Sequence, residues 1–107
     1  MILIARASFP RSSLKEAIRI FSQLPKLPAT VKRFGPFFSI DDQGKFHYLS
    51  FFKFSEPQIT FEEKKFIQKR FDHFAGVPGF TSSLDSWMSM EETLELLKKK
   101  GDDTQSG

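Results

Sequence analysis

The hydrophobic pattern of the chain shows two periods, and these predict helices and strands. Apolar residues recur at helical spacing over residues 14–24, over residues 61–75 and after residue 89. Between these stretches lie shorter segments in which side chains alternate at the spacing of a strand, over residues 2–8, 31–40, 45–54 and 80–88. The predicted order is therefore strand, helix, strand, strand, helix, strand and a final helix.

This βαββαβ order predicts an α+β domain of the ferredoxin-like sandwich type. Right-handed connections place the first and third strands in the middle of a four-stranded antiparallel sheet. The two main helices then cover one face of the sheet, and a further helix follows at the C-terminal end. The dipeptide Gly35-Pro36 interrupts the second strand, which predicts a bulge or kink, and the Pro favours an edge strand.

Three hydroxyl side chains mark the helix starts, because each stands three residues before a Glu. The hydroxyl accepts from an amide of the first turn and the Glu bonds back, as in a capping box. The three pairs are Ser13 with Glu16, Thr60 with Glu63, and Ser89 with Glu92. In the last helix, Met90, Leu94 and Leu97 are expected to face inward.

Alternation divides each central strand between the two faces of the sheet. In the first strand, Leu3, Ala5 and Ala7 are assigned to the helices. The third strand is divided with Leu49 and Phe51 under the helices. The opposite, helix-free face then carries Ile2, Ile4, Arg6, Phe46, Tyr48, Ser50 and Phe52.

Such an apolar face is rarely left exposed in a soluble monomer. A second copy of the chain, a ligand or nucleic acid should cover it. We expect a homodimer, with Ile2, Ile4, Phe46 and Phe52 in the contact between copies.

The length of 107 residues fits one domain. We place that domain at residues 1–100 and read the polar segment 101–107 as a flexible tail. The chain contains fourteen Phe but one Tyr and one Trp, which is more ring surface than a sheet covered on one side needs.

Charge and cysteine content narrow the classes of partner. The net charge of +3 is spread along the chain, which is typical of solvated helix faces and does not favour nucleic acid.

The chain has no Cys, which excludes disulfides and thiolate sites and is compatible with the cytoplasm. No apolar stretch is long enough for a membrane span, and no motif indicates a cofactor.

Arg6 is the first candidate for chemistry, because it lies in a central strand on the helix-free face. It is interpreted either as an anchor for an anionic ligand between two sheets or as the partner of Asp85 in a structural ion pair. Tyr48, Ser50 and Trp87 are expected to line the same cavity. Alternatively, they fill a dimer interface.

The two histidines do not form a recognisable site. His47 is expected to point toward the helices or the hairpin end, and His73 lies near a helix C-terminus. No third ligand has a metal-binding spacing, so the prediction is that neither binds metal.

The layout of residues 1–98 resembles the dimeric α/β-barrel superfamily. The resemblance rests on the strand order, on Val77-Pro78-Gly79-Phe80 before the last strand, and on Trp87-Met88-Ser89 leading into a capped helix. It is nearest to small bacterial members of unknown function. It implies two ferredoxin-like domains packed sheet to sheet. Relatives of this type include cofactor-independent monooxygenases, isomerases, chlorite-dismutase-type haem enzymes and ligand-sensing domains.

Three functions therefore stay open. The leading hypothesis is a homodimer that binds a small, partly apolar ligand, and the first alternative is a monooxygenase-like or isomerase-like enzyme. The second alternative is binding of single-stranded RNA, because the RRM shares the strand order and Phe46, Tyr48 and Phe51 match its aromatic positions. The sequence does not decide whether the chain is an enzyme.

Overall fold

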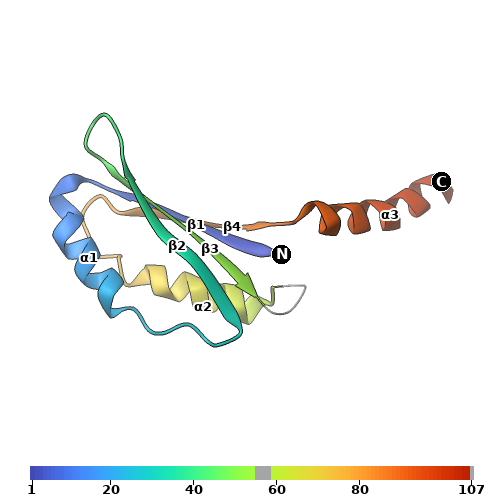
Figure 1. The fold of residues 1–107 in the computed structure, drawn as a ribbon, viewed down its shortest axis with the longest axis horizontal. Helices are drawn as coiled ribbons and strands as arrows, with labels where there is room; N and C mark the ends of the chain where they lie inside the picture. Colours follow the sequence, from blue (N-terminus) through green and yellow to red (C-terminus); the bar gives the residue numbers. More distant parts are fainter. Residues whose placement is uncertain (55–58, 107) are drawn as a thin grey trace.

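The computed structural model describes residues 1–54 and 59–106, with side chains as far as residue 98. It has an α+β fold with a four-stranded antiparallel sheet (Figure 1). The elements are β1 (Ile2–Phe9), the short 3₁₀ helix η1 (Arg11–Ser13), α1 (Leu14–Gln23), β2 (Val31–Ile40), β3 (Phe46–Phe54), α2 (Phe61–Asp72), β4 (Thr81–Trp87) and α3 (Met90–Ser106). The predicted order of strands and helices is confirmed.

The strands lie in the order β2-β3-β1-β4. The prediction that the first and third strands occupy the middle is therefore confirmed, and β2 and β4 form the edges. Helices α1 and α2 lie on the same side of the sheet (Figure 1). We call the other side the open face.

The core fills the space between α1, α2 and the sheet, and aromatic rings occupy most of it. On β1 the inward side chains Leu3, Ala5 and Ala7 are buried as predicted, and the two small residues let the helices approach closely. Near the end of α2, Phe74 stacks on Phe80 with ring centroids 4.3 Å apart. Much of the large supply of Phe is thus used beneath the helices.

The predicted division of β3 between the two faces is wrong. Ala7 lies opposite Tyr48, Ala5 opposite Ser50 and Leu3 opposite Phe52, and directly paired residues share a face. Phe46 pairs with Phe9 in the same way. Phe46, Tyr48, Ser50 and Phe52 therefore point toward the helices, whereas His47, Leu49, Phe51 and Lys53 point to the open face.

The bulge predicted in β2 is confirmed. Pairing with β3 shifts register between Phe34 and Phe37, around Gly35-Pro36. Phe34 lies opposite Phe51 and Phe37 opposite Leu49. The bulge therefore leaves two large rings of this edge strand on the open face.

Two of the three predicted capping boxes form. Thr60 and Glu63 exchange bonds of 3.0 and 3.1 Å, and Ser89 and Glu92 do the same. The prediction for Ser13 is wrong, because its hydroxyl donates to the carbonyl oxygen of Pro78 at 2.7 Å. A 3₁₀ turn precedes α1 instead, and Ser13 connects it to the segment before β4.

Helix α3 extends away from the sheet (Figure 1), so the expected inward packing of Met90, Leu94 and Leu97 is wrong. These side chains are 73%, 50% and 63% exposed. The base of the helix is held where the amino group of Met1 contacts Glu92 Oε2 at 2.6 Å.

The flexible tail expected over residues 101–107 lies outside the residues whose side chains are described. Among the described residues, no helix is both long and apolar enough to cross a membrane.

Candidate functional site

The open face carries a continuous set of apolar side chains, as expected, but β3 supplies a different set. Ile4 lies between Phe51 on β3 and Asp85 on β4. Phe34, Phe37 and Trp87 are about half exposed, at 52%, 54% and 49%. The apolar members of this face are Ile2, Ile4, Phe34, Phe37, Leu49, Phe51 and Trp87.

A hollow of about 310 Å³ lies on this face beside Arg6. Phe37 and Leu49 supply apolar wall, and Ser39 and His47 supply polar atoms. A second hollow of about 250 Å³ lies toward β4, and Arg6 and His47 border it as well. These two basic side chains thus separate two adjoining depressions of the open face.

Arg6 has no hydrogen bond or ion pair with any residue that the structure describes. It lies opposite Leu49 on β3 and Ser83 on β4. Asp85 is two positions further along β4, on the same face, but no ion pair joins it to Arg6 within the described chain. The guanidinium is therefore available to an anion from outside the chain.

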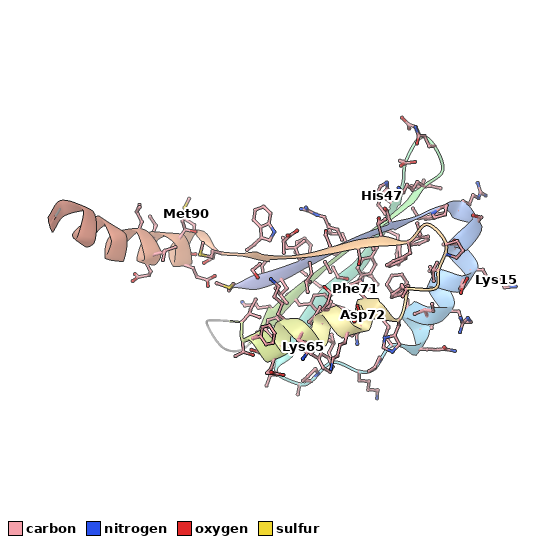
Figure 2. The ribbon with its side chains drawn as sticks, turned by 180° about the vertical axis from the view of Figure 1, so that it is seen from behind. Lys15, His47, Lys65, Phe71, Asp72 and Met90 are labelled. Carbon is pink, nitrogen blue, oxygen red and sulfur yellow. The ribbon has the colours of Figure 1, made fainter. Side chains whose placement is uncertain are left out.

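His47 is fixed by the turn between β2 and β3. Its Nε2 lies 3.0 Å from Asp41 Oδ2, while Asp41 Oδ1 accepts from the amides of Gln43 and Lys45. The hydrogen bond from His47, and then that from the Lys45 amide, lower the pKa of Asp41. Asp41 is thus ionised near neutral pH and holds the imidazole. Figure 2 shows His47 near the hairpin that joins β2 and β3.

The five predicted ligand-binding residues do not share one face. Arg6, Asp85 and Trp87 lie on the open face, and the register separates them by steps of two along β1 and β4. Tyr48 and Ser50 are buried under the helices. Of the predicted contact residues between copies, Ile2 and Ile4 lie on the open face, whereas Phe46 and Phe52 do not.

Tyr48 belongs to the aromatic core. Its ring stacks on Phe21 at 4.8 Å and meets Phe71 edge-on at 5.8 Å between centroids. Burial raises the pKa of the Tyr48 phenol because the interior disfavours the charged form. The ring packs α1 and α2 against the sheet, although Tyr48 also borders the hollow beside Arg6.

The histidines do not meet. His73 Nδ1 lies 3.0 Å from the Lys69 carbonyl oxygen, within α2 and its end, far along the chain from the His47–Asp41 pair. Among the described residues, no group of three His, Cys, Asp or Glu side chains is placed to hold a metal ion.

Sequence reasoning missed Arg70, which is 5% exposed on the inner side of α2. The signal was present in the helical pattern: Arg70 occupies a position of the apolar stripe that contains Phe66, Ile67, Phe71 and Phe74. A charged residue in such a stripe indicates a buried charge that needs a partner.

Comparison with known proteins gives no relative. No protein-family model matches the chain, and no significant match was found among curated proteins or solved structures.

Proposed function

We propose that this chain is a ferredoxin-like domain of the dimeric α/β-barrel type, which pairs through its open face and binds a small, partly apolar carboxylate beside Arg6. We place it in the cytoplasm. The observation that carries the proposal is Arg6, which has no ion pair within the described part of the chain and lies in a sheet face that is rich in apolar side chains and covered by neither α1 nor α2.

Self-association is supported by the size and composition of the open face. Half-exposed Phe34, Phe37 and Trp87 surround more buried residues such as Ile4, which is the arrangement of an interface core with an accessible margin. Antiparallel sheets that pack one face against a core commonly carry polar side chains on the other face. A second copy offers the same apolar surface and removes both from water.

The ligand class follows from the lining of the hollow at Arg6. A guanidinium binds a carboxylate through two parallel hydrogen bonds, and Phe37 with Leu49 contact an apolar body. The volume of about 310 Å³ is at the lower end for small-molecule sites. A second sheet packed over it would enclose the ligand further.

Association is tested by light scattering after gel filtration, at micromolar concentration. We expect a mass of twice 12.4 kDa for the wild type and a shift toward the monomer for Phe37→Glu. Ile40→Glu is the matched control, because Ile40 is equally exposed on the same strand but pairs with Phe46 on the helix side. A monomeric wild type, or equal effects of the two variants, contradicts pairing through the open face.

Ligand binding is tested by calorimetry with phenylacetate, using phenylacetamide as the uncharged analogue of the same shape. Arg6→Gln should weaken phenylacetate binding about tenfold, because a charged hydrogen-bonding partner is lost. Arg19→Gln removes the same charge from exposed α1 and should leave the affinity unchanged. Equal affinity for the acid and the amide would exclude the role of Arg6.

A second candidate, an enzyme with general acid–base chemistry, is favoured by His47. It borders both hollows with Arg6, and an ionised Asp41 holds its ring at 3.0 Å, as a base is held in proton-transfer sites. Incubation with an activated phenol and oxygen, comparing wild type with His47→Gln, tests this candidate. Turnover that is unchanged in His47→Gln, or absent from the wild type, counts against it.

The RNA alternative loses the residues on which it depended. Phe46 and Tyr48 lie on the helix side, so of the three aromatic positions only Phe51 faces the open side. A stacking platform needs rings accessible to bases, and Tyr48 is 5% exposed.

A further inference from the structure

A further cavity lies on the helix side of the sheet, apart from the two hollows of the open face. It has a volume of about 480 Å³, is open to solvent and is lined by the end of α1, the segment that follows it, β2 and α2. Its apolar wall includes Phe21, Leu24 and Leu27. Small-molecule sites in proteins have this size and combine apolar contacts with a few polar groups.

Three basic side chains line this cavity, and no carboxylate does. They are Lys26 from the segment after α1, Arg33 from β2 and Arg70 from α2. Arg33 lies opposite Phe52 in the sheet register, which places it on the helix side. The fold therefore gathers positive charge from three separate elements at one place.

The burial of the Arg70 side chain is not explained by a contribution to stability. It is 5% exposed, and its Nη1 donates to the Pro25 carbonyl oxygen. No ion pair joins Arg70 or Arg33 to a residue within the described part of the chain. A guanidinium has five N–H donors, and a buried charge without a counter-ion is costly.

The two guanidinium groups also disfavour each other. Burial, and after it the positive charge of Arg33, lower the pKa of Arg70. A bound anion would reverse this repulsion, because it would interact favourably with both groups at once. The repulsion between Arg33 and Arg70 thus favours an anion bound between them.

We propose that this cavity binds a phosphate monoester with a small apolar substituent, held by Arg33 and Arg70. Two guanidinium groups with Lys26 nearby match a dianion better than a monocarboxylate, and planar guanidinium forks match phosphate oxygens. Leu24, Leu27 and Phe21 contact the substituent. This site lies on the opposite side of the sheet from Arg6 and does not depend on pairing of two copies.

The proposal is tested by calorimetry with phenyl phosphate as the probe, in buffer free of phosphate. The wild type should bind it, and added salt should weaken the binding. Benzenesulfonate, a monoanion of similar shape, should bind more weakly, and so should inorganic phosphate, which lacks the ring. Equal binding of all three probes would overturn the assignment of an organic dianion.

The decisive variant is Arg33→Gln, because Arg33 is exposed on an edge strand and its replacement leaves the core intact. It should weaken phenyl phosphate binding about tenfold. Lys32→Gln is the matched control: it removes one positive charge from the neighbouring position, whose side chain lies on the open face. Equal losses for the two variants would show a general charge effect and refute the site.

Arg70→Gln provides a second variant, and its thermal unfolding is measured alongside binding to confirm that it folds. A folded Arg70→Gln should lose phenyl phosphate binding while retaining the phenylacetate binding assigned to Arg6. A folded variant that binds phenyl phosphate like the wild type would overturn the proposal. So would a wild type that does not bind phenyl phosphate at millimolar concentration.

Discussion

Trp87 lies directly opposite Ile2 in the pairing of β4 with β1, on the open face of the sheet. It is the only Trp of the chain and is about half exposed. Its fluorescence therefore reports whether that face is covered. If two copies pair through the open face, dilution should shift the emission maximum to longer wavelength as Trp87 becomes hydrated.

The Phe37→Glu variant is the reference for this measurement. Its emission should lie at the long-wavelength limit at every concentration, because the charge opposes pairing. A wild-type spectrum that is independent of concentration and equal to that of Phe37→Glu would contradict covering of Trp87. The measurement is independent of the mass determination and needs no added label.

A second prediction concerns Tyr48, the only Tyr of the chain. Because burial raises its pKa, the absorbance change of tyrosinate formation should have its midpoint above the ordinary value of about 10. The folded state holds this proton more tightly than the unfolded state does. The stability contribution of Tyr48 is thus fully present below about pH 10 and is lost as pH rises through the raised pKa.

The control for this titration is the same chain unfolded in urea. There the Tyr48 midpoint should return to about 10. Coincident midpoints in the folded and unfolded chains would place the phenol in water, on the face that alternation alone had assigned to it.

The side chains of β3 show what the alternation of a strand can and cannot predict. Alternation correctly separated its residues into two sets, but both sets contain large apolar groups. The set with His47 and Lys53 carries the basic side chains, and charged residues are seldom buried. Weighing those two positions, rather than Leu49 and Phe51, would have placed Tyr48 under the helices from the sequence alone.

Some features of the fold follow from the local sequence pattern, and others do not. Element order, the bulge at Gly35-Pro36 and two capping boxes follow from short-range chemistry, and the structure confirms them. The meeting of Arg33 with Arg70 depends on how α2 packs over β2, which is a long-range relationship. No spacing along the chain predicts that Arg33 and Arg70 lie close together, although the position of Arg70 in an apolar stripe indicates a buried charge.

The capping boxes give a third prediction, which compares Glu63 with Glu16. Each stands three residues after a hydroxyl side chain near the start of a helix. Glu63 accepts from the Thr60 amide at 3.0 Å, whereas the Ser13 hydroxyl opposite Glu16 bonds to Pro78 instead. Glu63→Ala should therefore lower the free energy of unfolding by about 0.5–1 kcal/mol more than Glu16→Ala does. Urea denaturation of both variants measures the difference, and equal costs would show that Thr60 and Glu63 do not act as a box.

A fourth prediction concerns Gly79, in the loop that leads to β4. Its φ of +73° lies in the left-handed region, and a Cβ there would stand 2.7 Å from the Pro10 Cδ. Gly79→Ala combines a backbone cost with a steric one. We expect the free energy of unfolding to fall by about 2–4 kcal/mol.

Two other glycines separate the causes of that loss. Gly44 also has a positive φ, +79°, but an added Cβ meets nothing within 4 Å, so Gly44→Ala should cost only the backbone part, about 1 kcal/mol. Gly76 lacks both the positive φ and the crowding, so Gly76→Ala should be neutral or slightly stabilising. If Gly79→Ala costs no more than Gly44→Ala, then Pro10 does not pack against the loop before β4.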